Sequence, residues 1–136
     1  MVNFIDKNGQ FDQTKMVSGD RVKIYSPQNI YVFEMTGSRE LVLDLDASMV
    51  PQALLDRLLA NRRMQELHYG DIEMEEMKIY LYMKWPYLSR RGTCLMYPKV
   101  PRAAMSPSIG EGDLFISDEV TDIQPDLPYK QPDAVA

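Results

Sequence analysis

The chain has 136 residues, of which 45% are hydrophobic and 26% are charged, so it is long enough for one domain with a core that needs no disulfide or metal. Its single Cys and single His exclude a disulfide framework within one chain and argue against a Cys/His zinc site. The net charge of −5 gives no overall electrostatic reason to bind nucleic acid or an anionic membrane.

Membrane and secretion signals are not expected. No apolar run approaches the roughly 20 residues of a membrane span, and the first residues lack a signal-peptide pattern. We therefore expect a protein without a membrane partner that is not secreted by a classical signal peptide. Its expected location is the cytoplasm, or a particle assembled in the cytoplasm.

Residues 4–11 predict a hairpin, because Asn8-Gly9 between apolar residues is typical of a type I′ turn. The same region alternates oxygen-bearing side chains as calcium loops do. A calcium loop, however, needs Gly at its sixth position and Glu at its twelfth. Counted from Asp6, Gly9 falls at the fourth position and Val17 at the twelfth, so we expect the hairpin and no calcium site.

Three strands are predicted next, at 21–25, 30–35 and 41–46, separated by turns. In the second, Tyr31, Phe33 and Met35 share one face. We interpret the three as antiparallel neighbours with one solvated face. In the third strand the leucines share one face, and Asp44 and Asp46 point away from it. We interpret this carboxylate pair as a solvated surface and not as a catalytic pair.

A helix is predicted to follow, with Ser48 as its N-cap, Pro51 in its first turn and Gly70 after its last residue near 69. Its apolar residues fall on two faces, because Leu54, Leu55, Leu58 and Leu59 form one stripe that Ala60, Met64 and Leu67 do not continue. Either the helix breaks near residue 61, or its second half contacts something other than the sheet.

Residues 72–85 fit two structures. From Met77 to Trp85, apolar residues alternate with Lys and Tyr, which predicts a long strand. The spacing of Met74, Met77, Leu81 and Trp85 would also suit a helix. A turn at 89–92 then leads to a strand at 93–97, the expected hairpin partner of the long strand.

The remainder of the chain is Pro-rich, with one more strand expected at 114–116. Residues 57–102 carry nine basic and five acidic side chains, whereas 103–136 carry one lysine and seven acids. We expect a single domain at 1–120 and an extended acidic arm at 121–136 that cannot form its own core. The charge contrast has two interpretations, loose pairing within one chain or head-to-tail contact between copies.

Residues 104–116 read Ala-Met-Ser-Pro-Ser-Ile-Gly-Glu-Gly-Asp-Leu-Phe-Ile. This segment resembles the nucleophile region of self-cleaving repressors and signal peptidases, which reads Ser-Met-x-Pro-Thr-Ile followed by Gly-Asp and an apolar strand. By this resemblance, the position of the family's nucleophilic serine is occupied by Ala104, which has no hydroxyl. The family also needs a lysine base later in the chain, and Lys130 is the only lysine that follows. It therefore implies an inactive relative without Ser–Lys hydrolysis. A shared turn geometry is the alternative.

No other pattern predicts catalysis. Cys94 and His68 are the single thiol–imidazole combination, and we interpret Cys94 as an inert buried thiol and His68 as a partner of a helix end. Glu73, Glu75 and Glu76 are more typical of a solvated segment than of a cation site. Phosphate-loop, nucleotide and nucleophile-elbow motifs are absent from the sequence. We predict no enzyme, no catalytic residue, no cofactor and no metal.

We interpret the basic and aromatic residues between 78 and 91 as an interaction surface. On a strand, their side chains would share one face, as a single-strand stacking platform or a subunit contact requires. The chain has ten methionines, most of which we assign to filling the core, and a buried protein–protein surface would account for the rest. The predicted interface consists of Lys78, Tyr80, Tyr82, Lys84, Tyr87, Arg90, Arg91, Asp122, Asp126 and Tyr129.

Together these features predict an α+β fold: a mostly antiparallel sheet, one principal helix and an extended acidic, Pro-rich C-terminal arm. The predicted function is that of a non-enzymatic structural or assembly protein, which contacts copies of itself or another protein subunit. A phage or virus particle is the expected setting. The two alternatives are an inactive relative of the repressor and signal-peptidase class, and a single-stranded nucleic-acid-binding module.

Overall fold

The computed structural model describes residues 3–71, 73, 77–83, 87–99 and 114–126. Its elements in chain order are β1 (Phe11–Asp12), the 3-10 helix η1 (Gln13–Lys15), β2 (Arg21–Tyr25), β3 (Ile30–Met35), β4 (Leu41–Leu43), α1 (Gln52–Tyr69), β5 (Lys78–Tyr82), β6 (Tyr87–Leu88), β7 (Thr93–Lys99), β8 (Phe115–Glu119) and β9 (Asp122–Pro125). All strand pairs are antiparallel. The predicted α+β class, a mostly antiparallel sheet with one principal helix, is confirmed.

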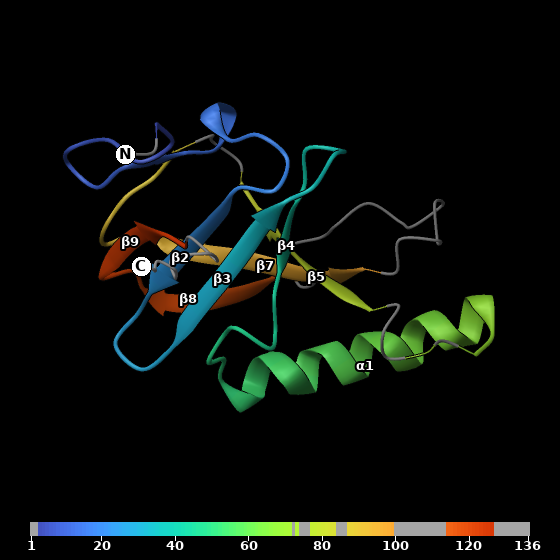
Figure 1. Ribbon diagram of the computed structural model, residues 1–136. Helices are drawn as coiled ribbons and strands as arrows, with labels where there is room; N and C mark the ends of the chain where they lie inside the picture. The colour runs from blue at the N-terminus through green and yellow to red at the C-terminus, as the bar shows by residue number, and fades with distance from the viewer. Residues whose placement is uncertain (1–2, 72, 74–76, 84–86, 100–113, 127–136) are drawn as a thin grey trace, which may run out of the picture.

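The seven-stranded sheet closes on itself (Figure 1). Its order is β8-β7-β5-β4-β3-β2-β9, so β8 and β9 occupy its two ends, yet only Val120 and Thr121 separate them in the chain. The Val120 N–H donates to the Gly92 carbonyl oxygen before β7, and the Thr121 N–H donates to the Tyr25 carbonyl oxygen at the end of β2, each at 2.8 Å. β8 and β9 are therefore two parts of one bent segment, which pairs with β7 at one end of the sheet and with β2 at the other and so closes a barrel.

Alternation along the barrel strands sends one set of side chains inward and the other outward. The register keeps partners on the same side, as with Val22 opposite Phe33 and Leu81 opposite Met96. The predicted apolar faces of 30–35 and 41–45 are confirmed. Buried side chains on the inward face include Val22, Ile24, Tyr31, Phe33, Met35, Leu41, Leu43, Ile79, Leu81, Cys94, Met96 and Ile123.

The helix α1 lies alongside the end of the sheet at which β3 begins (Figure 1). Leu54 and Leu58 join the core from its inner face. The predicted C-terminal stop is confirmed: Gly70 has a φ of 82°, which favours glycine, and its N–H donates to the Glu66 carbonyl oxygen. The helix is continuous to Tyr69, so the alternative of a break near residue 61 is wrong.

The predicted Ser48 N-cap is wrong, because the helix begins four residues later with Pro51 as its N-cap. The Ser48 hydroxyl instead donates to the Asp44 carbonyl oxygen at 2.6 Å and accepts from the Val32 N–H at 2.9 Å. Ser48 therefore stabilises the turn between β4 and α1 rather than the first turn of the helix.

The N-terminal segment covers the other end of the barrel. Phe4 and Phe11 pack edge to face, with ring centroids 6.2 Å apart, and join the core together with Met16. The hairpin predicted at 4–11 is confirmed by the bridge between Ile5 and Phe11.

The predicted type I′ turn in this hairpin is wrong. Only its Gly9 has a positive φ, 81°, and Asn8 does not. The Asp6 carbonyl oxygen accepts from the Gly9 N–H, and the Asp6 carboxylate accepts from the N–H groups of Asn8 and Gln10. This is a type I turn followed by a left-handed glycine.

Several predicted segments have different bounds in the structure. The strand predicted at 41–46 is β4, Leu41–Leu43, because the Asp44 carboxylate accepts from the N–H groups of Asp46 and Ala47 and turns the chain there. The long strand predicted from Met77 to Trp85 is β5, Lys78–Tyr82, so the helix alternative is wrong for these residues. Residues 72, 74–76 and 84–86 lie outside the described residues. Residues 122–125, assigned to the arm from the sequence, form β9 and pair with β2, and Ile123 is buried. The rest of the predicted arm, 127–136, lies outside the described residues.

Candidate functional site

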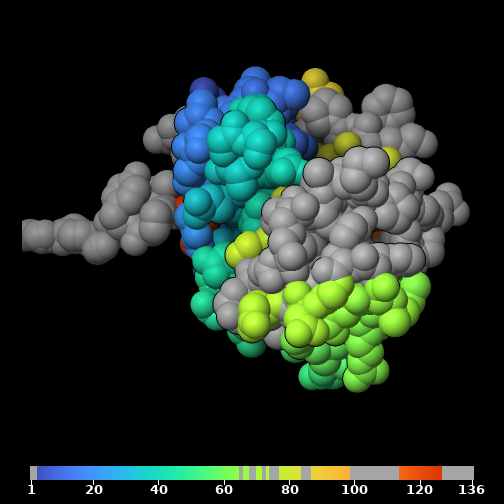
Figure 2. Space-filling view, turned by 90° about the vertical axis from the view of Figure 1, so that its right-hand side faces the viewer, coloured from blue at the N-terminus to red at the C-terminus, as the bar shows by residue number. Residues whose placement is uncertain are grey.

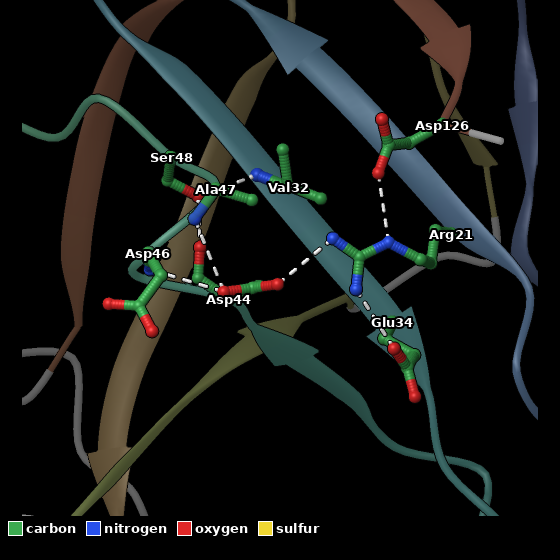
Figure 3. Close-up of polar contacts among 8 residues, drawn as sticks. All are labelled: Arg21, Val32, Glu34, Asp44, Asp46, Ala47, Ser48 and Asp126. Atoms are coloured by element: carbon green, nitrogen blue, oxygen red, sulfur yellow. Dashed lines mark hydrogen bonds and ion pairs between the residues drawn. The ribbon is translucent and has the colours of Figure 1, made fainter. Parts of the chain in front are cut away.

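Arg21 is the centre of a charged cluster on the outer face of the barrel (Figure 3). Its three guanidinium nitrogens each contact a different carboxylate: Nε donates to Asp126 at 2.8 Å, Nη1 to Glu34 at 2.9 Å and Nη2 to Asp44 at 2.9 Å. The Arg21 side chain is only 15% exposed. The cluster therefore joins β3, the β4–α1 turn and the residue after β9 to the first residue of β2.

Electrostatics in this cluster favour the charged forms. Burial lowers the pKa of Arg21, but hydrogen bonds with the three carboxylates outweigh it and leave the pKa above its ordinary value. Burial raises the pKa of Asp44, but the bond from Arg21 and those from the N–H groups of Ala47 and Asp46 outweigh it, so this pKa is lowered. The prediction that Asp44 merely solvates the surface is wrong, because Asp44 organises the turn and binds Arg21.

A cleft of about 630 Å³ opens beside this cluster. Its floor comes from the short strand β4 and from β5, which pair at one position, Val42 opposite Tyr80. Charged side chains of both signs line it, among them Glu34, Asp46 and Lys78. Within the described ranges, no group of three His, Cys, Asp or Glu side chains is arranged to hold a metal ion.

The barrel interior contains a few polar groups. Burial raises the pKa of the Cys94 thiol to about 12, which agrees with the prediction of an inert buried thiol. The Ser117 hydroxyl accepts from the Cys94 N–H at 2.8 Å and donates to the Asp118 carbonyl oxygen at 2.8 Å. A thiol–imidazole pair of Cys94 with His68 stays untested, because the side chain of His68 lies outside the described residues.

Tyr31 is the exception in this interior. Its hydroxyl is buried and has no hydrogen-bond partner among the described residues. Burial raises the pKa of Tyr31 to about 12, and the nearby Ser26 side chain offsets part of this rise. Ser26 does not, however, form a hydrogen bond with the Tyr31 hydroxyl. The ring stabilises the core, whereas the hydroxyl adds a desolvation cost.

We expect Tyr31→Phe to leave the free energy of unfolding unchanged or to raise it by up to about 1 kcal/mol, because it removes an unpaired buried hydroxyl without changing the ring. Urea denaturation of the two proteins measures this difference. A loss of more than about 1 kcal/mol would mean that the hydroxyl has a partner, such as an ordered water.

An apolar surface crosses the outer face of three neighbouring strands. Tyr82 on β5 lies opposite Leu95 on β7, which lies opposite Ile116 on β8. Tyr82 and Leu95 also line a hollow of about 140 Å³, together with Tyr87 from β6. Ile116 is 62% exposed and Tyr87 54%. We call Tyr82, Tyr87, Leu95 and Ile116 the tyrosine surface.

The predicted interface agrees with this surface only in part. Lys78, Tyr82, Tyr87, Arg90 and Arg91 are exposed. Tyr80 is not: it is 5% exposed and stacks on Tyr97 across the sheet, with ring centroids 5.6 Å apart. Lys84 and Tyr129 lie outside the described residues. Leu95 and Ile116 were missed, because adjacency across β5, β7 and β8 depends on a register that no local pattern specifies.

Acidic residues near the C-terminus pair within the chain. Asp126 binds Arg21, and Asp122 lies 3.9 Å from Arg90. For these two predicted interface residues the contacts favour pairing within one chain over contact between copies. The segment that resembles the repressor and signal-peptidase nucleophile, 104–113, lies outside the described residues, and only its following strand is seen, as β8.

The fold and its surfaces define a small antiparallel barrel of the α+β class with one helix packed outside it. No helix in the described ranges combines the length and apolar character needed to span a bilayer. No family model, curated protein or solved structure matches this chain. The function is therefore argued from the geometry of the barrel.

Proposed function

We propose that the protein is a non-enzymatic assembly component that makes protein–protein contacts through the tyrosine surface. The observation that carries this proposal is the apolar row Tyr82–Leu95–Ile116, which continues across three strands on the solvent side of a closed barrel. Single exposed apolar residues are ordinary, but contiguous ones on a sheet face are typical of interaction sites.

The size of the adjoining hollow supports a protein partner. Pockets for small molecules usually measure about 300–1,000 Å³, and the hollow at Tyr82 and Tyr87 measures about 140 Å³. That volume suits one apolar side chain of a partner protein. An anchoring side chain in a pocket, surrounded by flatter apolar contacts, is the arrangement found at the centre of protein interfaces.

Two observations weigh against the alternative of a single-strand nucleic-acid platform. Tyr80 is covered by Tyr97 and presents no free ring face, and Leu95 and Ile116 are aliphatic, so they offer no stacking plane. A repetitive particle such as a phage or virus assembly is the setting in which we propose that these contacts form.

Site-specific photo-crosslinking tests the proposed function. With benzoylphenylalanine at Tyr87 or Ile116, we expect cross-links to one recurring protein segment when assemblies are isolated from the native source. Met49, which is 63% exposed and bridges to Ile30 at the start of β3, not to the strands of the tyrosine surface, is the matched control position and should give little product. Equal yields at all three positions, or none at any, would contradict the proposal.

A further inference from the structure

The barrel wall has its fewest strand pairs between β4 and β5. These two strands pair at one position, Val42 opposite Tyr80, whereas β5 pairs with β7 at five positions. The cleft of about 630 Å³ opens at this place, and the residues that line it all fall in the described ranges. Sites for small ligands usually measure about 300–1,000 Å³. The cleft is therefore large enough for one amino-acid residue with its neighbouring peptide groups.

Negative charge outweighs positive charge around this cleft. The Arg21 guanidinium contacts three carboxylates, so the cluster as a whole keeps a net charge of −2. Asp46 adds a further carboxylate to the lining, and Lys78 is the one other cation there. The Asp46 carboxylate points away from Arg21 (Figure 3), and neither Asp46 nor Lys78 forms an ion pair in the described part of the chain.

This arrangement disfavours an anion and a metal ion as ligands. Each of the three Arg21 nitrogens already donates to a carboxylate, and the side chain is only 15% exposed, so an anion would have to displace one of those carboxylates. No three suitable side chains in the described ranges are placed to hold a metal ion. An organic cation needs neither rearrangement, because the excess of carboxylates attracts it directly.

The cleft also offers apolar contact next to its charges. Val42 and Leu45 line it and are each half-buried, so both keep some surface free for a ligand. Met77 and Ile79, which are 4% and 1% exposed, close it on the core side. A charged head on an apolar stem matches such a lining, and lysine and arginine side chains have this structure.

We propose that the cleft between β4 and β5 binds a basic side chain of a peptide segment. The apolar stem of that side chain packs on Val42 and Leu45, and its charged head lies near Glu34 and Asp46. This site is separate from the tyrosine surface, so the inference goes beyond the proposed function and does not depend on it.

Two probes of the same shape test the proposal. N-acetyl-arginine amide carries the guanidinium, and N-acetyl-citrulline amide replaces it with a neutral urea group. In an NMR titration of the full chain, the arginine probe should shift the amide signals of β4 and β5 saturably, with a Kd of about 1 mM. The citrulline probe should bind about fivefold more weakly, because it lacks the charge that the carboxylates attract.

Variants of the two lining residues that have no ion pair should act in opposite directions. Asp46→Asn should weaken binding of the arginine probe about threefold, and Lys78→Met should strengthen it about threefold. Asp118→Asn and Arg63→Met are the matched controls and should leave the Kd unchanged. Both control residues are exposed and lie outside the cleft. Arg63 belongs to the C-terminal half of α1, which Figure 2 shows in lime at the lower part of the molecular surface.

Three results would overturn the proposal. One is the absence of a saturable shift in β4 and β5, which would mean that the cleft takes no outside side chain. Another is equal affinity for the arginine and citrulline probes. The third is weaker binding in Lys78→Met together with binding of N-acetyl-aspartate amide, which would make the cleft an anion site. Cross-linking at Tyr87 and Ile116 is a separate measurement, so none of these results decides the proposed function.

Discussion

Truncation after Val120 is expected to abolish the folded state, although the sequence alone assigns everything beyond that residue to an arm. The shortened chain lacks β9, whose pairing with β2 closes the barrel. It also lacks Ile123, which is 3% exposed, and loss of a buried isoleucine side chain alone costs about 2–5 kcal/mol. Asp126, the closest partner of Arg21, is removed as well.

These losses compare with a total stability of about 5–15 kcal/mol for a domain of ordinary size. We therefore expect the chain 1–120 to give a collapsed amide spectrum by NMR and no cooperative thermal transition. Truncation after Pro128 is the control, because it keeps β9 and Asp126 and should preserve the dispersed spectrum. A well-dispersed spectrum from the chain 1–120 would show that the barrel does not need its closing strand.

The closure of the barrel marks the limit of what the sequence could predict. Strands β2 and β3 were predicted with their observed bounds, because period-2 alternation is a local signal that burial of one face imposes. β9 has no such signal: in Asp122-Ile123-Gln124-Pro125 a single residue, Ile123, is strongly apolar. Its pairing with β2, which lies about a hundred residues earlier in the chain, is decided by the whole fold.

Short-range chemistry was predicted more reliably than its exact geometry. The Asn8-Gly9 pair does mark a hairpin, but the Asp6 carboxylate binds the loop N–H groups and selects a different turn. Ser48 has the chemistry of an N-cap, yet its hydroxyl is engaged by the turn after β4. In both cases a competing side-chain hydrogen bond decided the outcome.

The site depends on contacts that are distant along the chain. The carboxylates around Arg21 come from positions 13, 23 and 105 residues away, so neither spacing nor composition brings them together. The exposed side of the second half of α1, by contrast, was visible in the sequence, because Met64 and Leu67 do not continue the buried stripe of the helix. The helix is continuous, so a break near residue 61 is excluded, and the alternative that its second half contacts something other than the sheet stays a prediction.

Replacement of Arg21 by Met is the second change with a large expected effect. The methionine keeps the volume of the aliphatic stem but leaves three converging carboxylates without their cation. Removing one partner from a buried ion pair costs about 3–5 kcal/mol. The carboxylates here are partly exposed, Glu34 most of all at 49%, and water screens their repulsion. We therefore expect a loss of about 2–4 kcal/mol at pH 7, measured by urea denaturation.

Two further variants separate the cluster from ordinary surface charge. Arg90→Met removes a guanidinium that is 61% exposed and 3.9 Å from Asp122, and it should change the free energy of unfolding by no more than about 0.5 kcal/mol. Arg21→Lys should recover only part of the wild-type stability, because a single ammonium cannot contact three carboxylates with the planar geometry of guanidinium.

The pH dependence of the Arg21→Met effect follows from the lowered pKa of Asp44. A carboxylate whose pKa is lower in the folded than in the unfolded chain stabilises the fold above its unfolded pKa, about 3.8 for an aspartate, and this contribution is lost as the pH falls through the folded value. In Arg21→Met the Asp44 carboxylate loses that benefit, and its protonation relieves the repulsion in the cluster. The stability difference between wild type and variant should therefore be largest above about pH 5 and shrink as the pH falls toward 3. A difference that stayed constant over this range would mean that Arg21 acts through the packing of its stem and not through its charge.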